Sequence, residues 1–501
     1  MSELFMGVDI GTTGVRAAIF NREGRQLGYS YREYPMRADT RGKAELEPDG
    51  VFGAFLEVVR EAVEENNCSR DIEAIGICSQ MHSLVAVDDR GNCLTNIITW
   101  ADNRPSEEAK FIEDNFECSE LYGITGCRVQ HQAYYPAKIR WLKRHYPGIY
   151  SKTYKYLTIK ALILFRLFGE FIIDISDASA TACFNIHKFQ WEDTVLKELA
   201  GIDRSRLGEA SDCTRILRNM KKEYAGKMGL DESVPVVIGS SDGIMANLGC
   251  GGTDGTTMSC TVGTSGALRV ASDKPLLDGR QRTWCYCLDE SIWVAGGVVN
   301  DGGIDLKWFR DSLKGPYEED MKNYGLKDIY QLFDRYAGEI SPGSDGLMFL
   351  PYLNGERSPG WHPDAAAHIC GVRYGHGTRH FIRAAMEGVL YNLYTIYNSL
   401  SRVEAGVERI VANGGYVKSK LWLQMQADIF NKEIYVSEVG EATAWGTAFT
   451  AMVGVGAADG FSSIKRSYSQ DGGIRPAAEN HEVYKNAYTK FLALYNQLIN
   501  K

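Results

Sequence analysis

The segments DIGTTGVR, at residues 9–16, and TVGTSGALR, at residues 261–269, decide the fold, because one kind of loop occurs twice, half a chain apart. Each copy follows a run typical of a buried strand, LFMGVDI before the first and TTMSCTV before the second. Glycine lets the backbone approach a ligand closely, and the amides and hydroxyls of a Gly-Thr-Ser turn can hold phosphate. Two such loops in matching context predict two related halves that hold one polyphosphate between them.

The domain organisation follows from the length and from a pattern that restarts. A chain of 501 residues is too long for one core, so two large domains are expected. Strands alternate with helices in both halves, which predicts an α/β fold with helices packed on a sheet in each half. At residues 234–251, VPVVIGSSDGIMANLGCG, a buried strand leads through a Gly/Ser turn into a small-residue helix. We therefore predict a boundary near Asp242, with domains over residues 1–243 and 244–501.

Charge and cysteine content exclude several classes of partner. The net charge of −9 argues against nucleic acid and against an acidic membrane, because both would need a basic face. A few basic residues in a cleft could still bind a small anion. The sequence contains no apolar run of about 18 residues, so no membrane-spanning helix is expected. The first residues lack a signal-peptide pattern. The twelve cysteines contain no C-x-x-C pair, so we expect reduced thiols and a cytoplasmic protein.

Further motifs occur in a fixed order along the chain. They are SQMHS at 79–83, ITWADNR at 98–104, SSDG at 240–243, LPYLNGERSP at 350–359 and NGGYVKSKLWLQMQADI at 413–429. Together with the two loops, and over nearly the whole chain, they resemble the FGGY carbohydrate kinases of the actin-like ATPase superfamily. The resemblance implies two ribonuclease-H-like domains with a cleft between them that binds ATP and a sugar. It also implies Mg²⁺ as a cofactor.

Two segments resemble the gluconate kinases within this family, residues 79–104 and VNDGGIDLKWFRD at 299–311. The chain departs from them at Asp301, where they often carry a second asparagine, and at Gln80, which xylulose kinases share. The resemblance implies ATP-dependent phosphorylation of D-gluconate to 6-phospho-D-gluconate, with a xylulose, other pentulose or polyol kinase as the alternative. A non-catalytic actin-like nucleotide-binding protein is an alternative of another class, but it would not need the SSDG, MHS and WADNR segments.

Two aspartates are the candidates for the chemistry. Phosphoryl transfer needs a bound triphosphate, neutralised charge and an alcohol aimed in line at the γ-phosphorus. Asp242 is the predicted general base, because a carboxylate at a strand-to-helix turn can accept the proton of the substrate hydroxyl. Its alternative role is to cap the following helix. By the resemblance, Asp9 lies near Mg²⁺ and binds it through water, although an isolated aspartate at a strand end more often caps the turn.

The nucleotide is expected to contact glycines and hydroxyl residues of both halves. The predicted nucleotide-binding residues are Gly11, Thr12, Thr13, Arg16, Gly263, Thr264, Ser265, Gly302, Gly303, Gly414, Gly415 and Gln424. A glycine pair lets ribose and adenine lie flat against the backbone. For Gly414 and Gly415 the alternative is a turn between a strand and a helix that is capped near Ser419.

The substrate is expected to contact the first half. The predicted residues are Gln80, Met81, His82, Trp100, Asp102 and Arg104. Trp100 would form an apolar wall, Asp102 would accept hydrogen bonds from hydroxyls, and Arg104 would oppose a carboxylate. A histidine beside methionine is more often a packed residue, and ADNRP is otherwise a solvated turn. Glu356 and Arg357 are expected to pair near the cleft. The predicted partner is a small sugar or sugar acid, and a homodimer is compatible with the sequence.

Overall fold

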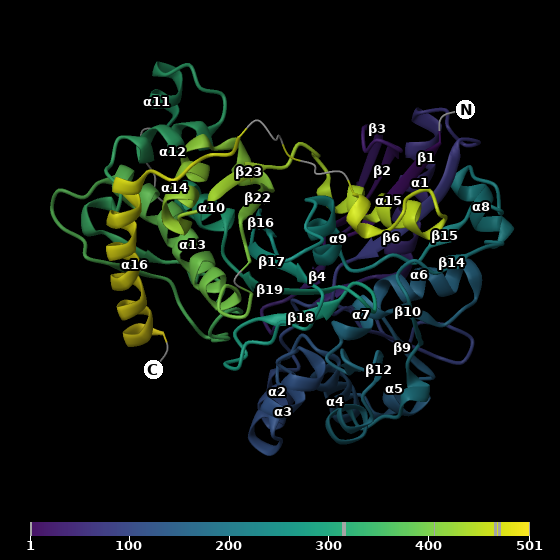
Figure 1. The fold of residues 1–501 in the computed structure, drawn as a ribbon. Coiled ribbons are helices and arrows are strands. Elements are labelled where there is room, and N and C mark those ends of the chain that lie inside the picture. Colours follow the sequence, from purple (N-terminus) through teal and green to yellow (C-terminus); the bar gives the residue numbers. More distant parts are fainter. Residues whose placement is uncertain (1–2, 313–316, 405, 465–467, 469–471, 500–501) are drawn as a thin grey trace.

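The computed structural model describes residues 3–312, 317–404, 406–464, 468 and 472–499. Figure 1 shows two lobes, one built around β1, β2 and β6 and the other around β16, β17 and β22. Each lobe contains a six-stranded sheet. The predicted α/β architecture is therefore confirmed in outline, and the order of the strands decides how closely the two lobes correspond.

The first sheet has the strand order β14-β15-β6-β1-β2-β3. Its strands are β1 (Leu4–Ile10), β2 (Gly14–Asn21), β3 (Gln26–Glu33), β6 (Ile72–Ser79), β14 (Ile216–Leu217) and β15 (Val236–Val237). β1 pairs antiparallel with β2 and parallel with β6, and β6 pairs parallel with β15. All seven residues of β1 are buried, because helices cover both faces of the sheet.

The second sheet repeats this arrangement in the order β18-β19-β17-β16-β22-β23. Its strands are β16 (Thr257–Val262), β17 (Gly266–Ser272), β18 (Trp284–Cys287), β19 (Trp293–Val299), β22 (Arg409–Asn413) and β23 (Glu433–Val436). β16 pairs antiparallel with β17 and parallel with β22, and β22 pairs parallel with β23. β16 and β17 thus correspond to β1 and β2. The prediction of two ribonuclease-H-like halves is confirmed.

Two helices join the lobes, α9 (Asp242–Gly249) after β15 and α15 (Ala442–Gly454) after β23. They pack against each other, and α15 also lies on β1 and β6 of the first sheet (Figure 1). At two glycines this contact leaves no room for a side chain. A Cβ atom on Gly7 would lie 1.9 Å from the Ala444 carbonyl oxygen, and one on Gly446 would lie 2.2 Å from the Met245 carbonyl oxygen. The domain boundary at residue 243 stays a prediction. Helix α15 belongs to the second half of the sequence but packs against the first sheet.

Helix α1 (Pro48–Glu65) packs against the strands β2 and β3. The carboxylate of Glu47 accepts hydrogen bonds from the amides of Asp49 and Gly50, and Pro48 occupies the first turn, where its missing N–H is not needed. Apolar residues spaced by three and four then form one buried face, which packs with Met6, Val8 and Ile10 of β1.

The remaining helices surround the sheets. Those of the first half are α2 (Ser106–Asn115), α3 (Cys118–Thr125), α4 (Tyr135–His145), α5 (Pro147–Lys152), α6 (Ile159–Phe168), α7 (Ile175–Ser179) and α8 (Lys222–Met228). Those of the second half are α10 (Gly303–Ser312), α11 (Tyr317–Asn323), α12 (Ile329–Gly338), α13 (Thr378–Leu400), α14 (Lys420–Phe430) and α16 (Ala478–Leu498). Within the described ranges, no helix combines the length and the apolar character that a membrane span requires.

Short strands complete the structure. They are β4 (Arg37–Ala38), β5 (Ala44–Leu46), β7 (Val85–Val87), β8 (Ile97–Ile98), β9 (Lys155–Leu157), β10 (Ile172–Asp174), β11 (Phe184–Asn185), β12 (Gln190–Trp191), β13 (Glu209–Ser211), β20 (Met348–Leu350) and β21 (His368–Cys370). The strand β8 pairs with β5 and precedes Trp100, so it fixes the start of the WADNR segment.

The close seating of α15 gives a test of stability. We expect Gly7→Ala to lower the free energy of unfolding by about 1–3 kcal/mol, because the new methyl group meets the Ala444 carbonyl oxygen. Gly53→Ala in α1 is the matched control. Nothing lies within 4 Å of its added Cβ, so the helix should gain about 0.5–1 kcal/mol. Denaturant unfolding measures both, and a Gly7→Ala protein as stable as the parent would contradict the packing.

Candidate active site

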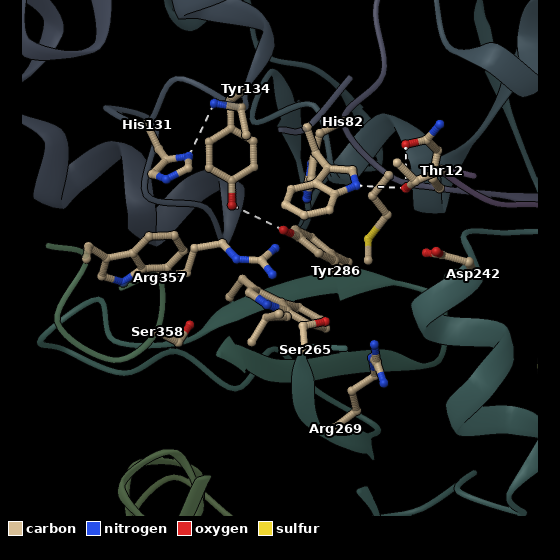
Figure 2. Close-up of a pocket in the computed structure, with 17 residues that line it drawn as sticks. Thr12, His82, His131, Tyr134, Asp242, Ser265, Arg269, Tyr286, Arg357 and Ser358 are labelled. Atoms are coloured by element: carbon tan, nitrogen blue, oxygen red, sulfur yellow. Dashed lines mark hydrogen bonds between the residues drawn. The ribbon is translucent and has the colours of Figure 1, made fainter. Parts of the chain in front are cut away.

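A cavity of about 240 Å³, here called the central cavity, is lined by residues of both halves (Figure 2). Its lining consists of Thr12, Gln80, Met81, His82, Trp100, His131, Ala133, Tyr134, Asp242, Ser265, Arg269, Trp284, Tyr286, Val298, Arg357, Ser358 and Trp361. Thr12 belongs to the first glycine-rich loop and Ser265 to the second. The structure therefore brings the two loops that the sequence singled out to one cavity.

The first loop is the hairpin connection between β1 and β2. The amide of Gly11 donates to the carbonyl oxygen of Gly14 at 2.9 Å, which closes the turn. The hydroxyl of Thr12 donates to Gln80 Oε1 at 3.1 Å and accepts from Trp100 Nε1 at 2.9 Å. These bonds tie the loop to two predicted substrate residues. Thr13 is exposed and its side chain is open to a ligand.

The second loop connects β16 and β17 in the same way. The amide of Gly263 donates to the Ser265 carbonyl oxygen at 2.9 Å. The amides of Gly302 and Gly303, where α10 begins, donate to the carbonyl oxygens of Thr264 and Gly263 at 3.0 and 2.7 Å. A Cβ on Gly302 would lie only 2.7 Å from the Ser265 carbonyl oxygen. The two glycines thus support the loop from behind, and Gly263 and Thr264 themselves are exposed.

Asp242 is the first residue of α9, and its carboxylate faces the central cavity (Figure 2). Ser241, not Asp242, occupies the capping position, while Asp242 Oδ1 accepts from the Gly243 amide at 2.7 Å. Burial and the charge of Asp9 raise the pKa of Asp242 to about 7, against the opposing effect of Arg269. A carboxyl group with this pKa is suited to accept a proton near neutral pH.

Asp9 lies at the end of β1 and is almost fully buried. Burial raises its pKa, and the guanidinium of Arg16 opposes the shift. Arg16 Nε lies 3.4 Å from Asp9 Oδ2, and Arg16 also pairs with Glu441 at 3.1 Å. Arg16, a predicted nucleotide residue, therefore contacts the carboxylates of Asp9 and Glu441.

A buried polar network holds the strand end that precedes Asp242. The ammonium of Lys160 donates to the Ser240 carbonyl oxygen at 2.7 Å and pairs with Asp174 at 2.7 Å and Asp177 at 3.4 Å. The hydroxyls of Ser176 and Ser241 lie 2.9 Å apart. Because these side chains are buried, the network fixes the backbone on which Asp242 stands.

Gln80, Met81, His82 and Trp100, four of the six predicted substrate residues, line the central cavity. The backbone of His82 has a positive φ of 65°, and its ring Nδ1 lies 2.8 Å from the Ala180 carbonyl oxygen. Since a carbonyl only accepts, Nδ1 carries the proton. Burial lowers the pKa of His82 to about 3, so the ring is neutral and Nε2 is a hydrogen-bond acceptor.

Asp102 and Arg104, the other two predicted substrate residues, lie away from the central cavity. Arg104 pairs with Asp102 at 2.6 Å and with Glu45 at 2.5 Å, and it stacks on Trp141 at 4.4 Å. Asp102 is fully buried and also accepts from the Ala44 amide at 3.0 Å. The two side chains thus satisfy each other and brace the loop that carries Trp100.

The predicted adenosine residues lie beside the second sheet. Gly414 and Gly415 are exposed, and a Cβ on Gly414 would lie 2.6 Å from the Val262 carbonyl oxygen, next to the second loop. Ser419 caps α14 by accepting from the Trp422 amide, as the alternative interpretation of this segment expected. Gln424 Nε2 donates to Asp428 and to the Arg475 carbonyl oxygen. None of these three predicted residues lines the central cavity.

Several lining residues were not among the predicted site residues: His131, Tyr134, Arg269, Trp284, Tyr286, Arg357, Ser358 and Trp361. Arg269 ends the second loop motif, as Arg16 ends the first, and this parallel could have marked it as a candidate site residue. The predicted pairing of Glu356 with Arg357 is wrong. Glu356 accepts a hydrogen bond from Tyr495 at 2.9 Å, while Arg357 Nε donates to Asn300 Oδ1 at 2.5 Å and its guanidinium faces the cavity (Figure 2).

Comparison with known proteins decides the family. The N-terminal domain model of the FGGY family of carbohydrate kinases matches residues 4–249, and the C-terminal domain model matches residues 258–455. The chain belongs to the FGGY family of carbohydrate kinases. The family predicted from the sequence is confirmed, and with it the assignment of the chain as a carbohydrate kinase.

Relatives of this FGGY kinase include enzymes for two kinds of substrate. A gluconokinase of Bacillus subtilis is 36% identical and covers 100% of this chain and 97% of its own length. A xylulose kinase of the same organism is 27% identical over 98% of this chain and 96% of its own. The crystal structure of a gluconate kinase from Lactobacillus acidophilus matches with a TM-score of 0.93 and 29% identity, over 99% of this chain and 98% of that one.

The pKa of Asp242 gives a testable pH dependence for the kinase. Its folded-state pKa is raised to about 7, so the carboxylate that a general base requires is lost as pH falls below 7. We expect kcat/KM, which reports the free enzyme, to fall about tenfold per pH unit below that value and to level off above it. A pH profile measured at constant ionic strength tests this, and a flat profile between pH 5.5 and 8 would contradict it.

Replacing the carboxylate tests the role directly. We expect Asp242→Asn to lower kcat by about 10²–10⁴-fold, because the amide cannot accept the proton, and to leave ATP and sugar binding within a few-fold. Asp89→Asn, at an exposed loop position, is the matched control and should behave as the parent. Turnover like that of the parent in a folded Asp242→Asn protein would remove the assignment.

Proposed function

We propose that this FGGY kinase transfers the γ-phosphoryl group of ATP to the C6 hydroxyl of D-gluconate, giving 6-phospho-D-gluconate and ADP. The observation that carries the proposal is the convergence of Thr12, Ser265 and Asp242 on one cavity (Figure 2). The choice of gluconate is supported by the relative with the name gluconokinase at 36% identity. The xylulose kinase at 27% identity supports the runner-up, a pentulose kinase.

In the proposed reaction, the substrate hydroxyl oxygen attacks the γ-phosphorus and its proton passes to the Asp242 carboxylate. The bond from the γ-phosphorus to the bridging oxygen breaks, and ADP leaves with that electron pair. The protein mainly positions the reactants and stabilises charge, as phosphoryl transfer requires. The amides and hydroxyls of residues 11–13 and 263–265 would hold the phosphates from opposite sides.

Two further side chains have roles in this proposal. Arg269 Nη1 bonds to Thr261 at 3.3 Å, and its guanidinium lies against Gly243, so it stands beside Asp242 and would attract the phosphate. His82, neutral and with Nε2 as an acceptor, would accept a hydrogen bond from a sugar hydroxyl. Gln80, Met81 and Trp100 would complete the wall of the sugar site.

The carboxylates near the loops fit a magnesium ion. Asp9 and Asp242 repel each other, so a cation near them would relieve this repulsion. Among the described residues, no group of three or more histidine, cysteine, aspartate or glutamate side chains could hold a metal. This suits Mg²⁺, which takes one or two carboxylates together with water and phosphate oxygens. Asp9 would hold it through water, and the ion would neutralise charge on the triphosphate.

Other predictions stay open beside this proposal. Binding of adenosine at Gly414 and Gly415, a cytoplasmic location and a homodimer remain predictions from the sequence. A non-catalytic nucleotide-binding protein would keep the loops but would show no ATP turnover stimulated by a sugar. Measurement of sugar-stimulated ATP turnover therefore separates this alternative from a kinase.

The substrate is tested by ADP release with gluconate, xylulose, ribulose and glycerol, each with and without ATP. We expect gluconate to give the highest kcat/KM, and phosphorus NMR to show one product phosphorylated at C6. Fast turnover of a neutral sugar with none of gluconate would contradict the choice of substrate. No turnover with any of them would favour the non-catalytic alternative.

A further inference from the structure

An aldonic acid such as gluconate brings a negative charge into the central cavity, and a cation should oppose it. Arg104, to which the sequence assigned this task, is already paired with Asp102 and Glu45 and does not line the cavity. Two guanidinium groups do line it, those of Arg269 and Arg357. The question is which of them is free to bind a carboxylate.

Arg269 lies at the end of the cavity where the chemistry is proposed. A Cβ on Gly243 would lie 3.0 Å from Arg269 Nε, so the guanidinium packs against the residue after Asp242. Asp242 raises the pKa of Arg269, although burial has the larger and opposite effect. Arg269 is therefore partly neutralised by the proposed base and stands where the phosphate would be.

Arg357 lies at the other side of the cavity, away from Asp242 (Figure 2). Its Nε donates to Asn300 Oδ1 at 2.5 Å, and Asn300 in turn donates to the Asn354 carbonyl oxygen at 2.8 Å. The guanidinium carbon lies 4.7 Å from the centre of the Trp100 ring. One hydrogen bond and one stacking contact thus fix the plane of the group and leave the Nη edge toward the cavity.

Arg357 has no direct carboxylate partner among the described residues, although the buried carboxyl group of Asp301 acts on it from beyond ion-pair distance and raises its pKa. In the part of the chain that the structure describes, no salt bridge to Arg357 is formed, whereas Arg16, Arg104 and Arg383 each pair with acidic side chains. Burial lowers the pKa of Arg357 to about 10, so the group stays charged at neutral pH. A buried guanidinium among aromatic rings with no direct ion-pair partner is poorly compensated, and a ligand carboxylate at its Nη edge would supply that partner.

We propose that Arg357 is the residue that selects an acidic substrate, by binding the C1 carboxylate of an open-chain aldonic acid while the far hydroxyl lies at Asp242. This inference rests on the proposed function and deepens it. The planar guanidinium offers two parallel N–H donors, which match a carboxylate and not a hydroxymethyl group. The hydroxyls of Tyr134 and Tyr286, 3.1 Å apart, lie beside the group and would contact the neighbouring substrate hydroxyls.

The test compares D-gluconate with D-glucitol, the same six-carbon chain with a hydroxymethyl group in place of the carboxylate. For the parent enzyme we expect kcat/KM for gluconate to exceed that for glucitol on the order of 100-fold or more. Arg357→Gln should lower kcat/KM for gluconate on the order of 100-fold, mainly through KM, and should change glucitol and the KM for ATP by no more than a few-fold. The ratio of kcat/KM for gluconate to kcat/KM for glucitol should therefore fall sharply in Arg357→Gln.

Two further variants keep the result interpretable. Arg357→Lys retains the charge without the planar fork, so its gluconate-to-glucitol ratio should lie between those of the parent and Arg357→Gln. Arg104→Gln tests the competing assignment and should leave the ratio unchanged, whatever its effect on the overall rate. If Arg357→Gln does not fold, as judged by circular dichroism, the gluconate-to-glucitol ratio of Arg357→Lys still tests the role of Arg357.

The outcomes separate this inference from the proposed function. A parent enzyme that phosphorylates only neutral sugars would overturn both. A parent enzyme that phosphorylates gluconate, with a ratio unchanged in Arg357→Gln and Arg357→Lys, would overturn the role of Arg357 alone. A ratio that collapses in Arg104→Gln instead would return the carboxylate site to the segment that the sequence first suggested.

Discussion

The repulsion between the carboxylates of Asp9 and Asp242 is the interaction on which the site depends. It contributes to a pKa of about 7 for Asp242, and it arises because the end of β1 and the start of α9 bring two acidic residues close together. Arg16 stands beside Asp9 and Arg269 beside Asp242, so each carboxylate has one cation close to it. The remaining repulsion disfavours the empty site and favours a ligand that brings positive charge with its phosphates.

The packing of α15 keeps these two carboxylates in place. α15 lies directly on β1, which ends close to Asp9, and packs against α9, which begins with Asp242. Main-chain contacts at Gly7 and Gly446 leave little freedom for this arrangement to shift. The residue before α15, Glu441, also pairs with Arg16. A helix from near the end of the chain thereby sets the distance between groups that come from its first half.

Much of this structure could be predicted from the sequence, because the decisive patterns are local. Buried strands that end in Gly-Thr turns and the strand-turn-helix around Asp242 are visible in a few consecutive residues. The roles of Arg104 and Arg357 could not be predicted in this way. Each depends on partners far along the chain, Glu45 for Arg104 and Asn300 with Trp100 for Arg357. Tyr134 and Tyr286 likewise meet only in the folded protein, and neither stands in a recognisable motif.

In the proposed complex a triphosphate lies between the two loops, with the reacting hydroxyl at Asp242. A crystal structure with a non-hydrolysable ATP analogue, Mg²⁺ and gluconate would show whether the ligands lie there. We expect γ-phosphate oxygens within hydrogen-bond distance of residues 11–13 and 263–265, and the C6 hydroxyl within such a distance of the Asp242 carboxylate. A nucleotide bound away from these loops, or a gluconate with no hydroxyl near Asp242, would contradict this arrangement.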